Sequence, residues 1–179
     1  MSAGVSATVA IRRLDGSARA SLLAHLLALS VTDRWLRFGR TVSPTSIASY
    51  VDRIDFGRDA ILGIHDDGDL LVGMAHAAFD TDPAEVALSV LPAYRGRALG
   101  KLLFASAVAQ AARRGVARLY MQFLSSNTPV LRIAERFGMD LRVRGRDVEA
   151  HLDFATQHRK QIGATTEINV LQTPDSIVS

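Results

Sequence analysis

A basic, glycine-containing turn, RGRALG at residues 95–100, stands between an apolar run and a run rich in Ala and Leu. A turn that leads into a helix directs several backbone N–H groups outward, and the helix dipole adds partial positive charge there. Glycine lets a ligand approach the backbone, while Arg95, Arg97 and Lys101 supply full charges that can pair with phosphate oxygens. The pattern therefore predicts a site for a small anionic ligand, with phosphate groups held at a helix N-terminus.

Two common nucleotide-binding loops do not fit this turn. It lacks the four-residue gap and the Ser or Thr after lysine that a Walker loop requires. It also lacks a GxGxxG pattern with an acidic residue about 20 residues later. The alternative without a ligand is an exposed basic turn whose glycines serve tight geometry alone.

The segments around the turn predict an α+β domain. Apolar and polar residues alternate in the segments interpreted as strands, and apolar residues recur at helical spacing in those interpreted as helices. The expected fold is a mixed, mostly antiparallel sheet of about six to seven strands flanked by about four helices. Strands are expected near 8–14, 59–65, 70–79, 84–91 and 116–124 and on both sides of Gly145, and helices over 17–30, 43–54, 101–115 and 127–138.

Length and composition indicate one globular domain. A chain of 179 residues can form one sizeable core, and we expect a single domain over 1–154, followed by a tail or arm of unknown order over 155–179. No run approaches the ~20 apolar residues of a membrane span, and the N-terminus lacks the pattern of a secretory signal. The absence of cysteine excludes a disulfide framework, a cysteine thiolate nucleophile and a zinc–thiolate site, and it fits the cytoplasm, which is the expected location.

Charge is unevenly distributed along the chain. Residues 91–146 carry a local net charge of +9, with eleven Arg or Lys and two acidic residues, whereas residues 52–85 carry a net charge of −7. The basic residues occur without interleaved aromatics or a nucleic-acid-binding motif, so a small polyanion is favoured over nucleic acid. The acidic segment would attract a cationic acceptor molecule.

Two longer segments carry a further pattern, AEVALSVLPAYRGRALGKLL and then SSNTPVLRIAERFGM. Together they resemble the GNAT superfamily of N-acetyltransferases, whose phosphate loop has the pattern Arg/Gln-x-x-Gly-x-Gly/Ala. The resemblance implies acetyl-CoA as co-substrate and no metal. It implies that the pantetheine arm pairs with the strand edge near Leu88 and Val90 and contacts Asn127. The residues implied to hold the pyrophosphate are Arg95, Gly96, Arg97, Ala98, Leu99, Gly100 and Lys101.

One branch of that superfamily is nearer in pattern. The stretch TDRWLRFGRTVSPTSIASYVDRIDFGRDAILGI is similar to the entry of the catalytic domain in bacterial Pat-type protein lysine acetyltransferases. Glu85 matches by spacing a glutamate of those enzymes, and the resemblance implies that it is the general base for the amine. The implied acceptor is a small-molecule primary amine or a protein lysine. We expect a monomer or homodimer, with no nucleic-acid or membrane partner.

Two positions depart from the family pattern. Ala98 stands where the loop pattern has its first glycine, and its methyl group narrows the space over the backbone. Ala134 stands where a tyrosine often serves as general acid, so the leaving thiolate would be protonated by water or by another group. These departures keep open an alternative function, a non-catalytic acyl-CoA-binding module for sensing or assembly.

Histidines and aromatic residues give further candidates. His65 and His76 fall on the middle strands and could act as bases, although a lone histidine on a strand is more often packed or exposed. His25 is interpreted as structural. Phe38 and Tyr50 are predicted to pack a pair of helices, in a region that often walls the acceptor site of the resembled fold.

Overall fold

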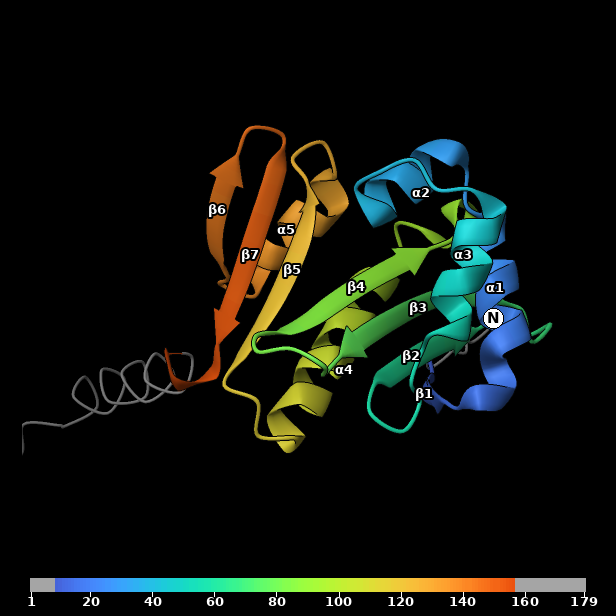
Figure 1. Ribbon diagram of the computed structural model, residues 1–179, viewed down its shortest axis with the longest axis horizontal. Coiled ribbons are helices and arrows are strands. Elements are labelled where there is room, and N and C mark those ends of the chain that lie inside the picture. Colours follow the sequence, from blue (N-terminus) through green and yellow to red (C-terminus); the bar gives the residue numbers. More distant parts are fainter. Residues whose placement is uncertain (1–8, 157–179) are drawn as a thin grey trace, which may run out of the picture.

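One seven-stranded sheet runs through residues 9–156, the part of the chain that this computed structural model describes (Figure 1). Its strands follow the order β1-β2-β3-β4-β5-β7-β6, and all neighbouring pairs are antiparallel except β4–β5, which is parallel. The predicted α+β fold with a mixed, mostly antiparallel sheet is therefore confirmed. The strands are β1 Ile11–Leu14, β2 Ala60–His65, β3 Leu71–Ala78, β4 Ala84–Val90, β5 Arg118–Leu124, β6 Asp140–Arg144 and β7 Asp147–Asp153.

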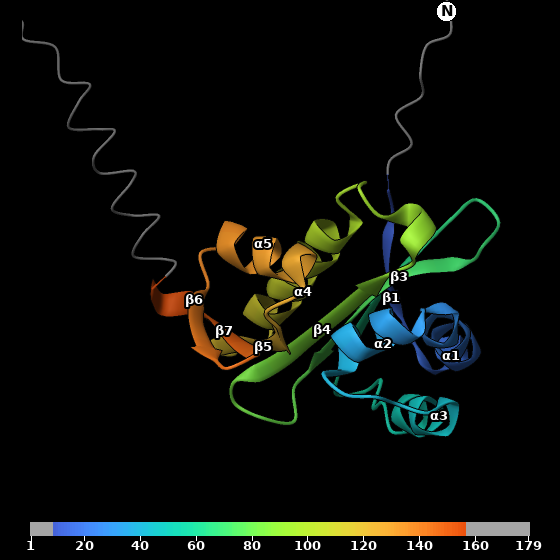
Figure 2. The ribbon, with the colours of Figure 1, turned by 90° about the horizontal axis from the view of Figure 1, so that it is seen from above.

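Helices cover the sheet from both sides. The first three lie on one side of it, and the last two pack against the other face (Figure 2). A 3-10 turn at Pro92–Tyr94 leads from β4 into the loop before the fourth helix. The α-helices of the described residues are α1 Arg19–Ala28, α2 Val31–Phe38, α3 Pro44–Asp52, α4 Leu99–Arg113 and α5 Thr128–Arg136.

The second helix, α2, was not predicted, since two helices were expected after the first strand and three are present. Its apolar residues are irregularly spaced, but its ends carry clear local signals. The hydroxyl of Ser30 accepts a hydrogen bond from the N–H of Asp33 at 3.0 Å, and the chain leaves the helix at Gly39 with φ of 67°. A side-chain cap and a left-handed glycine are sufficient to begin and end a helix of about two turns.

Two apolar cores hold the sheet between the helices. The larger lies between the sheet and α4 and α5, and it includes the fully buried Leu103, Phe104 and Leu119. The smaller lies between the sheet and α1–α3, and it includes Leu22 and Met74. Burial of each large apolar side chain contributes roughly 1.5–3 kcal/mol, and β4 joins the larger core through Ala84 and Val86.

The sheet splits between β4 and β5. Their parallel pairing is confined to Ala84 with Leu119 and Glu85 with Tyr120, after which the two strands diverge (Figure 1). From Val86 to Val90, β4 pairs only with β3 among the described strands. The edge of β4 that faces β5 is thus left open at the end from which the chain enters α4.

Candidate active site

A cavity of about 440 Å³ lies beside the open end of β4. It is bounded by the last residues of β4, the loop that follows, the first turn of α4, and the helices α2 and α5. Most of the residues predicted to bind the cofactor meet there. Those that line the cavity are Leu88, Val90, Arg95, Gly96, Ala98, Leu99, Gly100, Lys101 and Asn127. Arg97 lies outside the lining, with its guanidinium carbon 5.3 Å from the ring centre of Tyr94.

The loop before α4 has two left-handed residues, Gly96 with φ of 77° and Ala98 with φ of 59°. Glycine adopts this conformation freely, whereas the Cβ of Ala98 makes it cost roughly 1 kcal/mol. Directly after Ala98 the helix α4 begins, with no side-chain cap among the described residues and no acidic residue in its first turn. Its first N–H groups and dipole therefore suit an anionic partner on the cavity side.

Gly100 lets three elements approach one another at the cavity. A Cβ at this position would lie 3.2 Å from Cδ1 of Ile133 on α5 and 3.6 Å from Cδ1 of Leu88 on β4. A larger side chain would push α5 away or fill the space over β4. The second glycine of RGRALG thus serves close packing, whereas the first serves backbone conformation.

Arg95 is already engaged by protein groups. Its Nη2 lies 2.8 Å from Oδ1 of Asp33 on α2, and its Nε donates a hydrogen bond to the carbonyl of Val90 at 3.1 Å. Burial raises the pKa of Asp33, but hydrogen bonds from Ser30 and Arg95 outweigh this and lower it. The ion pair joins α2 to the loop across one side of the cavity.

The wall formed by α2 was missed by sequence reasoning. Asp33 and Arg37 face the cavity from this helix, and Nε of Arg37 is buried with no hydrogen-bond partner among the described residues. Only the helix-capping pattern around Ser30 and Gly39 could have indicated that these residues share one helix face.

A buried histidine fixes the neighbouring part of β4. Nδ1 of His25 donates to the carbonyl of Leu71 at 2.8 Å, and its Nε2 accepts from Oγ of Ser89 at 2.9 Å. Burial lowers the pKa of His25 to about 4, so this imidazole is neutral at pH 7. The structural interpretation of His25 is consistent with these contacts, which hold the cavity-lining Ser89 in place.

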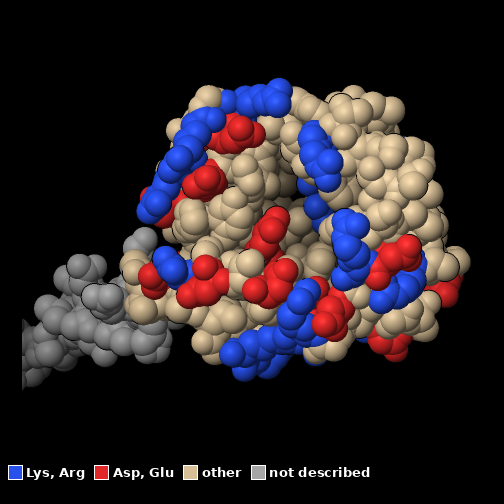
Figure 3. All heavy atoms as spheres, viewed as in Figure 1, with Lys and Arg blue, Asp and Glu red and all other residues tan. Residues whose placement is uncertain are grey.

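Glu85 lies at the other end of β4, outside the cavity lining. It is exposed, and it pairs with Ala78 of β3 and Tyr120 of β5 at the point where β4 and β5 separate. The face of the molecule seen in Figure 3 is hollowed near this separation, and side chains of both charges surround the hollow. A molecule arriving from solvent can therefore reach Glu85 without a conformational change.

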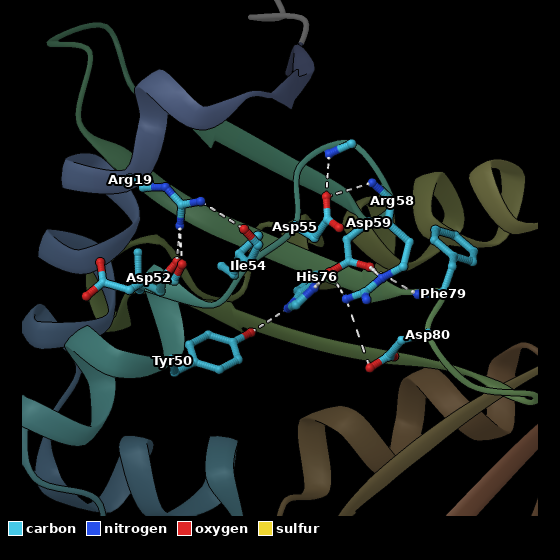
Figure 4. A network of polar contacts seen from close by, with 12 residues as sticks. Arg19, Tyr50, Asp52, Ile54, Asp55, Arg58, Asp59, His76, Phe79 and Asp80 are labelled. Carbon is cyan, nitrogen blue, oxygen red and sulfur yellow. Dashed lines mark hydrogen bonds and ion pairs between the residues drawn. The ribbon is translucent and has the colours of Figure 1, made fainter.

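A chain of polar contacts lies on the side of β3 that α1–α3 cover (Figure 4). Nη2 of Arg37 donates to Oη of Tyr50 at 3.1 Å, and this oxygen lies 2.6 Å from Nδ1 of His76. Nε2 of His76 lies 3.1 Å from Oδ2 of Asp59, which also accepts from Nε of Arg58 through its other oxygen at 2.8 Å. His76 was predicted from the sequence as a possible base, but its hydrogen-bond partners were not predicted.

The charge state of this chain follows from burial and hydrogen bonding. Burial raises the pKa of Asp59, but hydrogen bonds from Arg58, His76 and the N–H of Phe79 outweigh burial and lower it to about 2. Burial lowers the pKa of His76 from 6.5, with the hydrogen bond to Asp59 acting in the opposite direction. At pH 7 this series of hydrogen-bonded side chains therefore contains the carboxylate of Asp59 and the neutral imidazole of His76.

Comparison with known proteins identifies the family of this arrangement. Residues 30–139 match the Acetyltransferase (GNAT) family. The chain belongs to this family. Its match covers α2 to α5, and so includes both ends of β4 and the whole loop before α4.

Solved structures share the GNAT fold. The GNAT domain of S. lividans PAT superposes with a TM-score of 0.69 at 21% identity, covering 80% of this chain and 89% of that one. The PaiA N-acetyltransferase from Thermoplasma acidophilum, in complex with coenzyme A, gives 0.64 at 17% identity, covering 82% and 99%. The yncA structure from Salmonella typhimurium with acetyl-CoA gives 0.62 at 17%, covering 82% and 94%.

Among residues 9–156, no group of three or more His, Cys, Asp or Glu side chains is arranged to hold a metal ion. None of the helices in that range combines the length and apolar character needed to cross a membrane.

Proposed function

We propose that this GNAT acetyltransferase moves the acetyl group of acetyl-CoA to a primary amine, either a small molecule or a protein lysine. The observation that carries the proposal is the convergence of β4, the loop 95–98 and the first turn of α4 on one cavity. Structures of the same fold from Salmonella typhimurium and Thermoplasma acidophilum contain acetyl-CoA and coenzyme A, respectively.

The cavity residues fit an acyl-CoA. The uncapped N–H groups at the start of α4, together with Lys101, can hold the pyrophosphate, and the open edge of β4 can pair with the amides of the pantetheine arm. Leu88 and Val90 border that edge, and Asn127 faces it from the start of α5. The buried Nε of Arg37 would gain a partner from an acceptor atom in the cavity. Bound acetyl-CoA would supply the activated acetyl group.

Glu85 is proposed as the general base. A lysine-like amine has a pKa near ~10.4, so only about one molecule in a few thousand is neutral at pH 7. The carboxylate of Glu85 is exposed at the point where β4 and β5 separate, so it can take a proton from an incoming ammonium directly or through a water. The amine then reaches the acetyl group from the open face, opposite α4.

The first experiment measures binding and turnover separately. Coenzyme A and acetyl-CoA are added in a thermal-shift titration, and thiol release from acetyl-CoA is then followed with a panel of polyamines, small amines and lysine peptides. We expect CoA to raise Tm and at least one amine to release thiol. Failure of CoA to bind would overturn the assignment of the cavity.

The role of Glu85 is tested in the same assay with a matched pair of variants. Glu85→Gln should lower kcat about 10²-fold without changing the thermal shift by CoA, whereas Glu135→Gln, on the exposed side of α5, should leave both unchanged. An unchanged kcat in Glu85→Gln would remove it as the base. Binding of CoA without turnover of any amine would favour the acyl-CoA-binding module that the departures at Ala98 and Ala134 keep open.

A further inference from the structure

The chain of contacts from Tyr50 to Asp59 comes from three separate elements. Tyr50 lies on α3, His76 on β3, and Asp59 directly before β2, and they are drawn together in Figure 4. Side chains that meet from such distant segments are positioned by the fold rather than by local sequence. The side chains of His76 and Asp59 are 11% and 1% exposed, so both hydrogen bonds are shielded from water.

The direction of the hydrogen bonds along this chain is fixed by its ends. A guanidinium can only donate, so Oη of Tyr50 accepts from Arg37 and directs its own proton to Nδ1 of His76. The remaining proton of the neutral imidazole is then on Nε2, where it is donated to Asp59. This order of hydroxyl, imidazole and carboxylate is the arrangement in which an imidazole accepts a proton from a hydroxyl while a carboxylate stabilises the resulting imidazolium.

The hydrogen-bonded side chains of Tyr50, His76 and Asp59 lie beside the strand where the reaction is proposed to occur. His76 pairs directly with Ala87 of β4, and Glu85 is two residues along on the same face of that strand. Arg37, which lines the cavity, is also the donor to Tyr50, so only one guanidinium separates the phenol from the cavity. The phenol is therefore hydrogen-bonded on one side to a residue that lines the cavity and on the other to the cross-strand partner of Ala87.

We propose that Tyr50 is a catalytic residue that carries a proton from the attacking nitrogen to the leaving sulfur, with His76 holding the proton in between and Asp59 positioning His76. The proposal rests on the proposed acetyl transfer. It supplies the general acid for which the sequence offers no tyrosine at position 134. Glu85 and Tyr50 then have different tasks, because an ammonium loses two protons when it becomes an amide.

In this reaction the nitrogen loses two protons and the sulfur gains one. Glu85 removes the first proton, which passes to solvent, and the nitrogen lone pair forms the C–N bond. The second proton moves from nitrogen to Oη of Tyr50 while the phenol proton moves to Nδ1 of His76. The C–S bond breaks with its electron pair on sulfur, Tyr50 gives a proton to the sulfur, and His76 returns its proton to Tyr50. The products are the amide and the thiol of CoA, and Tyr50 and His76 return to their starting protonation states.

The neighbours of His76 determine how its imidazole titrates. The imidazole is buried and hydrogen-bonded to Asp59, whose carboxylate also pairs with Arg58. The charge of Arg37 disfavours its protonated form, and the charge of Asp80 favours it. Burial is the largest of these effects and lowers the pKa of His76. Neutral His76 is the form that can accept a proton, so kcat should fall as pH is lowered through this pKa. The charged or titratable groups around it are Arg37, Tyr50, Arg58, Asp59, Asp80 and, two residues from its cross-strand partner, Glu85.

The first test needs neither turnover nor substitution. ¹⁵N NMR of the full wild-type chain, with the His76 ring assigned through bonds to its own backbone, reports which ring nitrogen carries the proton at pH 7. We expect the proton on Nε2 and an unprotonated Nδ1. A proton on Nδ1 would overturn the proposal, because that nitrogen could not then accept the proton of Tyr50.

The second test uses kinetics with acetyl-CoA and the best amine from the panel. Tyr50→Phe, which keeps the ring that packs edge-on against Phe38 at 5.5 Å, and His76→Gln should each lower kcat about 10²-fold. KM for the amine and the thermal shift by CoA should change less than about threefold. The dependence of kcat on the D₂O fraction should be curved in the wild type, because two protons move together, and linear in Tyr50→Phe. His65→Gln, on β2 outside this chain of contacts, is the control and should match the wild type.

The outcomes separate this proposal from the proposed function. Turnover by the wild type with unchanged kcat in Tyr50→Phe and His76→Gln rejects the proton relay and leaves acetyl transfer standing. A wild type that binds CoA but acetylates no amine rejects the proposed function itself, and the relay with it. If either variant fails to fold, the NMR measurement on the wild type still decides.

Discussion

The two ends of β4 are built in different ways. At the end that leads into α4, the backbone determines the site through two left-handed residues, an uncapped helix start and a glycine that permits close packing. At the other end, side chains from α3, β3 and the segment before β2 determine it, around an exposed Glu85. A site formed by the backbone is encoded by consecutive residues. A site formed by side chains depends on the fold, which brings together residues that are distant in the sequence.

The largest expected effect sharpens this comparison at the side-chain end. Asp59→Asn removes a buried carboxylate that pairs with Arg58 and His76, and we expect the free energy of unfolding to fall by about 3 kcal/mol, measured by urea titration. Affinity for CoA, measured by calorimetry on the folded variant, should remain within about twofold of the wild type. A large loss of CoA affinity would show that the two ends are not independent.

The second prediction concerns the cavity end of β4, where His25 holds Ser89. The unfolded chain binds a proton at His25 near pH 6.5, but burial delays protonation in the folded state to a pKa of about 4. This stability is fully present above pH 6.5 and is lost as pH falls through 4. We expect His25 to reduce the free energy of unfolding by about 2 kcal/mol between pH 7 and pH 4.5.

Urea titrations across this pH range measure the effect. His25→Gln cannot titrate, so its stability should be lower at pH 7 but change less with pH. An equal slope in the wild type and the variant would assign the pH dependence to other groups.

The third prediction tests the backbone end. Gly96→Ala places a Cβ on a residue with φ of 77° where no atom lies within 4 Å, so the only penalty is backbone strain. We expect a loss of about 1 kcal/mol in stability and a fall in CoA affinity of about fivefold, if the loop relaxes away from its binding conformation. Gly16→Ala, where there is equal space and no positive φ, is the control. An unchanged affinity in Gly96→Ala would mean that the loop backbone does not hold the ligand.

The smallest effect is expected from Ala98→Gly. Glycine removes the strain of a left-handed alanine at φ of 59°, although it also makes the unfolded chain more flexible. These effects partly cancel, so stability should change by less than about 1 kcal/mol, while CoA affinity should rise about two- to threefold. Isothermal titration calorimetry with CoA measures the affinity. A weaker affinity in Ala98→Gly would show that the methyl group of Ala98 contacts the ligand favourably.

The same difference explains what could be predicted from the sequence. The strands, the hairpins and the helix after RGRALG follow local periodicity and turn residues, and nine residues of the predicted cofactor site meet in one cavity. The pairing of Arg95 with Asp33 could not be predicted, because the two residues are far apart in sequence and α2 itself was missed. The partners of His76 could not be predicted for the same reason. The sequence alone shows only that Asp59 belongs to an acidic segment.

The short parallel ladder between β4 and β5 also has a consequence for how the chain folds. The strands β1 to β4 pair with their sequence neighbours, whereas Glu85 must find Tyr120 across the whole of α4. Pairing over longer loops forms more slowly, so the two halves of the sheet should assemble separately and join late, chiefly through the apolar core around α4. Amide hydrogen exchange should then be fastest along this seam within the sheet. The opening proposed to admit the substrates is also the place where the native sheet is least continuous.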